Sequence, residues 1–180
     1  MSQLKVNSIV PVGGLPSGAN GGIIQTVQVV HTATVSTTGI TYVDTGLSAS
    51  ITPSSSSNKI LVLVCQGYFI TRSTDQARGG FRLLGDSGGS GMSVLEQGPN
   101  AGSGTEPNGL GHSTNLGGVV QFAGRYNLHY LDSPATTSST TYKTQFANAQ
   151  SSSSPTIFVN SGTGSGEMGS GFMTLMEVTT

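Results

Sequence analysis

Apolar and polar residues alternate along much of this chain, which is typical of β-strands with one buried face. The first alternating stretch starts at Ile23, and alternate positions from Val27 to Val35 lie on its apolar side, with Val30 as the exception. The most regular alternation covers residues 120–130. The same pattern predicts shorter strands over residues 42–43, 47–52, 81–84, 140–146 and 156–159.

Two further stretches are apolar at nearly every position. They cover Lys59 to Ile70 and Phe172 to Val178. A strand of this kind is typical of the middle of a sheet that is covered on both sides. We therefore expect both to be central strands that are buried on both faces. Cys65 lies within the first and is expected to be a small core residue.

No segment shows the 3.6-residue period of an amphipathic helix over ten residues. Clusters of Pro, Ser and Asn separate the strands at 53–58, near Pro134 and at 151–155. Eight to ten strands with such turns predict an all-β fold, an antiparallel β-sandwich that is jelly-roll-like. A parallel α/β fold is excluded because the sequence offers no crossover helices.

Residues 1–22 predict an extended N-terminal arm for anchoring or oligomerisation, followed by a sandwich domain over residues 23–180. Gly and Pro recur in this segment, so no regular element is expected there. A solvated linker has no use for aliphatic side chains, whereas an arm that lies along another subunit buries them. The alternative is a frayed tail. The anchoring residues are Leu4, Val6, Ile9, Val10, Val12 and Leu15.

Residues 85–118 interrupt the strand pattern with many Gly, Pro and Asn, and only Met92, Val94 and Leu95 hint at a strand there. Loops whose ends are fixed by a rigid sandwich often contain the residues that bind a ligand or a partner. The small polar side chains of this loop suit hydrogen bonds to a sugar or to another protein. The alternatives are a mobile loop and a subunit contact. The candidate contact residues are Glu106, Asn108, His112 and Asn115.

The composition narrows the range of partners. Charged residues make up 8% of the 180 residues and the net charge is −1, so the basic surface that nucleic acids or anionic membranes require is absent. The longest apolar run, Ile60 to Cys65, is too short to cross a bilayer, so we expect no membrane insertion. Ser, Thr and Gly dominate, with 26, 22 and 27 residues, and abundant Thr favours strands over helices.

Two motifs resemble catalytic or cofactor signatures without their context. Gly85–Gly89 reads GDSGG, as around a serine protease nucleophile, but only 84 residues precede it, and His31 lies on the apolar side of its strand. We interpret GDSGG as a turn and His31 as a core histidine. Gly164–Gly169 matches GxGxxG but precedes a predicted strand, whereas a dinucleotide site needs a helix there.

No cluster of metal ligands is found in the sequence. The three His residues are far apart, the eight carboxylates are isolated, and no calcium-loop pattern occurs. A carboxylate pair that only the fold brings together remains open. We therefore expect no catalytic residues, no metal and no cofactor, and we expect the protein not to be an enzyme.

Four segments carry a resemblance that runs over nearly the whole chain. They are LKVNSIVPVGGLPSGANGG (4–22), ITPSSSSNKILVLV (51–64), YLDSPATTSSTTYK (130–143) and FMTLMEV (172–178). Together they resemble the structural proteins of marine bacteriophages, especially cyanophages, in which a short N-terminal segment leads into a β-rich tail-fibre or virion domain. The resemblance implies a homotrimer that contacts other virion proteins, and it supplies no catalytic residues.

The expected function is therefore a non-enzymatic structural subunit of a phage virion, assembled in the reducing host cytoplasm, where a single Cys needs no disulfide. Because no coiled-coil or β-helical shaft separates arm and domain, a short tail fibre, a knob or a capsid-surface decoration is favoured over a long fibre. The alternative is an attachment module in which the 85–118 loop binds a host surface glycan or protein.

Overall fold

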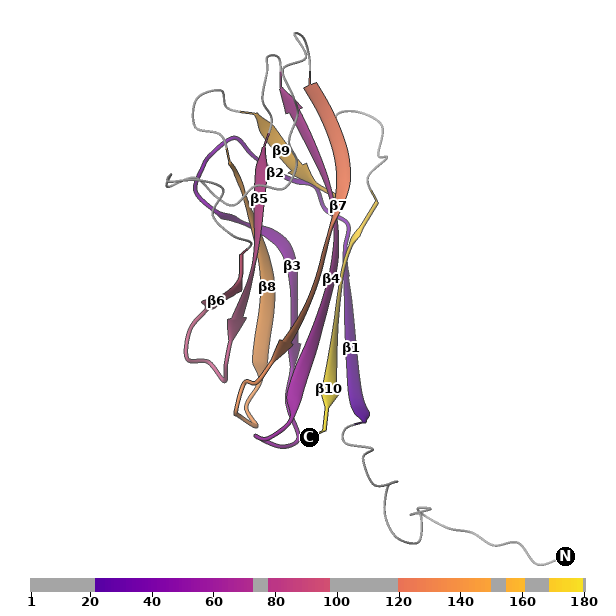
Figure 1. Cartoon of the computed structure of the whole chain (residues 1–180), viewed down its shortest axis with the longest axis vertical. Coiled ribbons are helices and arrows are strands. Elements are labelled where there is room, and N and C mark those ends of the chain that lie inside the picture. Colours follow the sequence, from indigo (N-terminus) through magenta and orange to yellow (C-terminus); the bar gives the residue numbers. More distant parts are fainter. Residues whose placement is uncertain (1–21, 73–77, 98–119, 150–154, 161–168, 180) are drawn as a thin grey trace, which may run out of the picture.

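The computed structural model describes residues 22–72, 78–97, 120–149, 155–160 and 169–179, and every regular element within them is a β-strand. The strands form two antiparallel sheets that face each other (Figure 1). Their bounds are β1 Ile23–His31, β2 Val35–Thr37, β3 Val43–Ile51, β4 Lys59–Arg72, β5 Gly79–Asp86, β6 Ser93–Glu96, β7 Val120–Asp132, β8 Thr140–Asn148, β9 Thr156–Val159 and β10 Gly171–Val178.

Sheet A is organised around β4, the longest strand. One edge of β4 pairs with β7 along its whole length, from Ile60 opposite Asp132 to Arg72 opposite Val120. Its other edge is shared, because β10 pairs with the first half and β9 with the second. The strand β1 lies outside β10, and β2 lies outside β9.

Sheet B has the order β3-β8-β5-β6. If the short strands β2 and β9 are set aside, eight strands remain. Sheet A then consists of β1, β10, β4 and β7, which are the first, eighth, third and sixth of these eight strands along the chain. Sheet B consists of β3, β8, β5 and β6, which are the second, seventh, fourth and fifth. This is the strand order of a jelly roll. The all-β, sandwich prediction is therefore confirmed, and the strands fall close to the predicted segments.

Two boundaries differ from the prediction. The loop expected to begin at residue 85 starts later, because β5 continues to Asp86 and β6 covers Ser93–Glu96. The segments expected at 42–43 and 47–52 join into the single strand β3, whose register against β8 shifts between Asp44 and Ser48. Burial still alternates through this irregularity. The sequence pattern reads as two pieces because the buried position between Val43 and Leu47 is occupied by the polar residue Thr45.

The expectation that β4 and β10 are buried on both faces is wrong. Both strands are central, but only alternate residues are buried, such as Val62 and Val64 in β4, while Leu61 and Leu63 between them are half-buried. The physical reason is that sheet B covers one face of sheet A only. Cys65 shares the outward side and is half-buried, so it is not a core residue.

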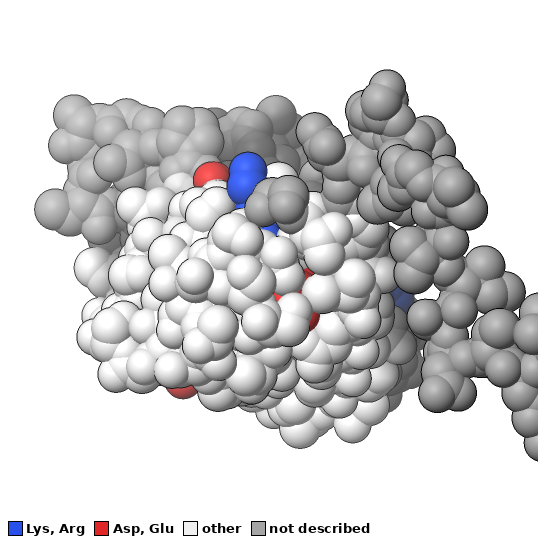
Figure 2. Space-filling model, turned by 90° about the horizontal axis from the view of Figure 1, so that it is seen from below, with Lys and Arg blue, Asp and Glu red and all other residues white. Residues whose placement is uncertain are grey.

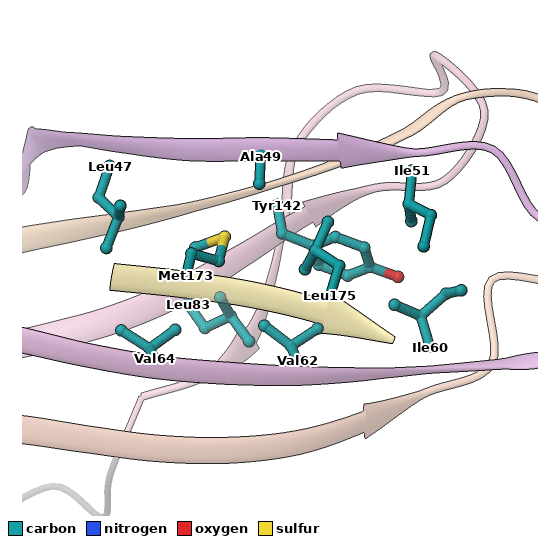
Figure 3. Close-up of a cluster of buried hydrophobic side chains, with 10 residues drawn as sticks. All are labelled: Leu47, Ala49, Ile51, Ile60, Val62, Val64, Leu83, Tyr142, Met173 and Leu175. Carbon is teal, nitrogen blue, oxygen red and sulfur yellow. The ribbon is translucent and has the colours of Figure 1, made fainter. Parts of the chain in front are cut away.

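The interior holds two apolar clusters. The larger lies between β3, β4, β8 and β10 and includes Leu47, Val62, Tyr142 and Leu175 (Figure 3). The second is centred on Phe81, whose ring stacks on Tyr126 at 4.9 Å and on Phe146 at 5.9 Å between ring centroids.

Buried polar side chains lie where the two clusters meet. In β4, Gln66 falls between Val64 of the larger cluster and Tyr68 of the second. In sheet B, Thr45 and Thr144 occupy the equivalent positions of β3 and β8, and their hydroxyl oxygens are 2.6 Å apart. These residues form a polar layer across the sandwich, a feature that the alternation pattern does not predict.

The polar layer ties the strands of sheet A to one another. Gln66 Nε2 donates to Asn160 Oδ1, which follows β9. Asn160 Nδ2 in turn donates to the carbonyl of Ala33, at 3.0 Å, and lies 2.8 Å from His31 Nδ1. Because an amide nitrogen only donates, that imidazole nitrogen accepts. His31 is therefore a structural histidine, but it is half-buried and so is not the core residue that its place on the apolar side of the strand predicts.

Gly171 leaves the space that the Gln66 amide occupies. A Cβ on Gly171 would lie 2.6 Å from Gln66 Nε2 and 2.8 Å from Gln66 Oε1, closer than real contacts allow. The two residues lie one position beyond the Phe172–Cys65 pair, at which the β10–β4 ladder ends. The Gln66 amide thus fills the space that a side chain at position 171 of the neighbouring strand would otherwise occupy.

We predict that Gly171→Ala lowers the free energy of unfolding by about 1–3 kcal/mol, as overpacking a filled interior does. Gln66→Ala also destabilises, because it removes the bond to Asn160. The double variant should lose less than the sum of the two, since the small side chain at position 66 makes room for the new methyl group. Urea unfolding of the three variants measures this coupling, and strict additivity would contradict it.

Candidate interaction surfaces

The outer face of sheet A carries a largely apolar surface, the outer stripe. It is formed by alternate residues of the two central strands and is interrupted in β10 by Thr174, whose Oγ1 accepts from Gln28 Nε2 at 3.1 Å. Two apolar side chains that flank it, Val30 and Leu131, are 49% and 51% exposed. Phe172 within the stripe is 37% exposed. We define the outer stripe as Leu61, Leu63 and Cys65 of β4 with Phe172, Met176 and Val178 of β10.

Strand register explains why these side chains meet. Phe172 lies opposite Cys65 on one side and Val30 on the other, so three strands place one row across the sheet. A second row joins Met176, Leu61 and Leu131. Side chains that are opposite in an antiparallel pair are about 4.5–5.5 Å apart at Cβ, so each row is an unbroken apolar contact.

Charged groups border the outer stripe only at its ends. Lys59 begins β4 at one end. At the other, Arg125 of β7 reaches across β4, where its Nη1 lies 3.4 Å from both Cys65 Sγ and the carbonyl oxygen of Ser170. The end of the sandwich at which the described chain begins and ends carries few charged atoms (Figure 2).

The outer face of sheet B is polar and hydrogen-bonded. Asp44 accepts from Lys143 Nζ at 3.0 Å and from Gln145 Nε2 at 2.6 Å. Gln145 Oε1 accepts from Arg82 Nε at 2.8 Å and Nη2 at 2.6 Å. The Arg82 guanidinium lies 4.1 Å from the ring centroid of Tyr42, at cation–π distance. The outer face of sheet B is therefore more polar than the outer stripe of sheet A.

This network favours the ionised form of Asp44. Partial burial alone would raise the pKa of the carboxyl, but the hydrogen bonds from Gln145 and Lys143 and the charges of Lys143 and Arg82 lower the pKa below its ordinary value. The negative charge of Asp44 is stabilised by the donors Lys143 and Gln145. We interpret the cluster as a preformed polar surface with no free general base.

A buried carboxylate fastens the end of β10 to its neighbours. Glu177 is 1% exposed, and its Oε1 accepts from Ser54 N and Ser54 Oγ at 2.7 Å and from Asn58 Nδ2 at 2.6 Å. With its amide nitrogen turned toward acceptors, Gln25 donates to Oε2 at 3.2 Å. Burial raises the pKa of Glu177, and these hydrogen bonds outweigh it, so the net pKa lies below the ordinary value.

The role of this carboxylate was not predicted, because the eight acidic residues are all isolated from one another along the sequence. One signal was available. Glu177 is the one charged residue in the apolar segment from Phe172 to Val178, and it shares the parity of Met173 and Leu175, which are buried. A charged side chain on a buried face requires partners. Those partners lie more than one hundred residues away in the chain, in the turn before β4.

The predicted interaction residues lie outside the described residues. This holds for the arm residues, Leu4, Val6, Ile9, Val10, Val12 and Leu15, and for the loop residues, Glu106, Asn108, His112 and Asn115. Both sets stay predictions. The described part of the predicted loop contains the turn after β5 and the strand β6.

The protease-like motif is a turn, as predicted. Gly88, Gly89 and Gly91 have positive φ angles, of 66°, 82° and 101°, and Asp86 Oδ1 accepts from the Gly91 N–H at 3.0 Å. The motif therefore reverses the chain between β5 and β6, and His31 is bonded to Asn160 instead.

The described residues contain neither a cluster of three metal-ligating side chains nor a helix long and apolar enough to span a membrane. Their buried tyrosines are weak acids. Burial raises the pKa of Tyr126 to about 12. Burial also raises the pKa of Tyr142, whose hydroxyl donates to Asp132 Oδ2 at 2.7 Å.

No family model matches this chain, and no curated protein matches it in sequence. Among solved structures, the chain is similar to one from the Gx strain of infectious bursal disease virus, with a TM-score of 0.37 and 12% identity over 86% of this chain and 39% of that chain. The Gt strain gives 0.37 and 14% over 87% and 40%. A mutant VP2 protein of this virus, in derived T=1 particles, gives 0.37 and 15% over 86% and 36%. The chain thus spans less than half the length of these solved chains.

We predict that Glu177 makes stability depend on acid pH. Its folded-state pKa lies below the ordinary value near 4.5, so its contribution is present above that value and is lost as the pH falls through the folded pKa. Glu177→Gln should be less stable at pH 7 by about 1–3 kcal/mol, since the amide keeps one acceptor oxygen but loses the charge and places a donor nitrogen among buried donors.

Urea unfolding between pH 7 and pH 3 measures the effect. The native protein should lose more stability on acidification than Glu177→Gln does. Asp44→Asn is the matched control, because Asp44 also has a lowered pKa but is exposed, and it should change the profile less. Equal acid sensitivity in the native protein and Glu177→Gln would contradict the assignment.

Proposed function

We propose that this protein is a non-enzymatic structural subunit of a bacteriophage particle, such as a short tail fibre, a knob or a capsid-surface appendage. In this proposal residues 1–22 anchor the subunit or join it to copies of itself, and the sandwich is displayed. The observation that carries the proposal is the contrast between the two outer faces of the sandwich. One is polar and carries a network of side-chain hydrogen bonds, and the other bears the uncharged outer stripe.

In a sandwich that is not part of an assembly, the outer faces of both sheets are in contact with water. Each sheet needs one face buried against the other sheet, and its second face is ordinarily polar. Contiguous exposed apolar surface on a soluble domain is typical of an interaction site. Aliphatic side chains gain about 1.5–3 kcal/mol each on full burial, so both the outer stripe and the apolar arm gain stability in an assembly.

Two further features support this function. The sequence resembles phage structural proteins over the segments described above. The jelly-roll strand order is common in viral capsid domains, although lectin domains and cupins share it. Fold alone therefore leaves the role open, and the contrast between the two outer faces supports a subunit that packs in an assembly. The partners are other copies of the chain, as a homotrimer, and other virion proteins.

We predict that the full-length variant Val6→Asp/Ile9→Asp/Val12→Asp loses self-association and incorporation into particles. Three buried charges would oppose the anchoring of the arm, while the sandwich should keep its β-sheet spectrum and unfolding midpoint. The matched control, Asn7→Asp/Ser8→Asp/Ser17→Asp, adds the same charge to polar arm positions and should assemble normally. Sedimentation velocity and mass spectrometry of purified particles give the readouts, and an intact trimer in the first variant would refute the anchor.

The second candidate is an attachment module that binds a host surface glycan or protein. It is favoured by the polar face of sheet B, where Arg82, Gln145 and Asp44 hold side-chain donors and acceptors in fixed positions. The edge strand of that sheet, β6, leads directly into the predicted contact loop.

For this candidate we predict that a Gly-Ser linker in place of residues 98–118 abolishes adsorption of particles to the host, while the subunit content of the particles stays the same. The four substitutions Glu106→Ala, Asn108→Ala, His112→Ala and Asn115→Ala, made together, should reproduce the loss. Unchanged adsorption in both variants would leave the structural role alone.

A further inference from the structure

The described chain begins beside the outer stripe. Gly22 N donates to Thr179 Oγ1 at 2.8 Å, and Thr179 N donates to the Gly22 carbonyl at 3.0 Å. The next residue, Ile23, pairs with Val178 at the end of the stripe. Residues 1–21 are therefore tethered at the end of an apolar surface that the described residues leave open.

The chemistry of these residues matches that surface. Lys5 is the one charged side chain among residues 1–21, and six of their side chains are aliphatic. The outer stripe itself is uncharged, with Arg125 and Lys59 at its ends. An extended chain covers about 3.3 Å per residue, so residues 4–15 can span roughly 35–40 Å, more than the roughly 20 Å that the stripe covers between Phe172 and Val178.

The direction of β1 favours a neighbouring copy over the same copy. This strand runs from Ile23, at the end of the sandwich, toward His31 (Figure 1). A chain that continues the line of β1 backward leaves the molecule at that end. Gly22 is held in line with β1 by its bonds to Thr179. To cover its own sheet, the chain would have to turn back on itself between residues 15 and 22, a turn that a neighbouring copy does not require.

We propose that residues 4–15 of one copy lie along the outer stripe of sheet A in a neighbouring copy. This inference rests on the proposed structural function and names the surface that receives the arm. The arm of the neighbouring copy covers Leu61, Leu63 and Phe172. Each copy places its own arm on one neighbour and binds the arm of another. Such an exchange forms a closed ring when the rotations between successive copies add up to a full turn, and otherwise continues as an open filament.

Cys65 provides the probe, because the chain has one cysteine and it lies in the outer stripe. The experiment introduces a single second cysteine into the full-length protein, as Val6→Cys, Ile9→Cys, Val10→Cys or Val12→Cys. A disulfide forms only where the two Cα atoms approach within about 4.4–6.8 Å, so the series covers the possible registers. After mild oxidation, denaturing gels without reductant and peptide mass spectrometry locate the link.

The expected result is a disulfide between different chains that joins Cys65 to at least one arm position. It should be lost in the matching variant with Cys65→Ser. A third variant, which combines the reactive arm substitution with Cys65→Ser and Ser48→Cys, moves the probe to the exposed polar face of sheet B and should stay uncrosslinked.

A link within one chain at every position would overturn the inference in favour of the arm covering its own sheet. Failure of all four variants to react with Cys65 would also overturn it. These failures are distinguishable from failure of the proposed function. If the arm aspartates abolish assembly while no arm cysteine reaches Cys65, the arm anchors elsewhere. If the aspartates leave assembly intact, both proposals fail.

Discussion

Backbone pairing along β4 is the interaction on which the rest of the structure depends. It joins β7 on one edge to β10 and β9 on the other, and through them β1 and β2. Because side chains of a strand alternate between faces, this pairing also assigns Val62 and Val64 to the interior and Leu61 and Leu63 to the outside. A strand that is apolar throughout makes both faces of its sheet apolar, and the second sheet covers only one of them.

The two outer faces then differ in what they can do. On sheet B, Asp44, Gln145 and Arg82 satisfy one another, so that face is stable in water. On sheet A, the outer stripe gains free energy only when something apolar covers it. A subunit with one solvated face and one apolar face has a preferred orientation in any assembly, with the polar face outward.

The interior shows how polar groups specify this packing. Gln66, Asn160 and His31 join three strands of sheet A, and Glu177 joins β10 to the turn before β4. Each buried polar group is costly unless bonded, so a shift of one residue in register would leave several without partners. The polar layer thus opposes alternative registers that the apolar side chains alone, many of them similar in size, would tolerate.

The local sequence pattern was enough to predict the all-β class, the positions of most strands, the central place of β4 and β10 and the GDSGG turn. It could not tell which side of β4 is covered, and it misplaced Cys65 for that reason. It also missed the pairing of Gln66 with Asn160, which are 94 residues apart, and the donors to Glu177, which are 119 and 123 residues away. The amino-acid sequence by itself determined where strands form, because strand formation follows from neighbours along the chain. Only the tertiary structure decided which faces meet and which polar groups bond, because those contacts depend on residues that folding alone brings together.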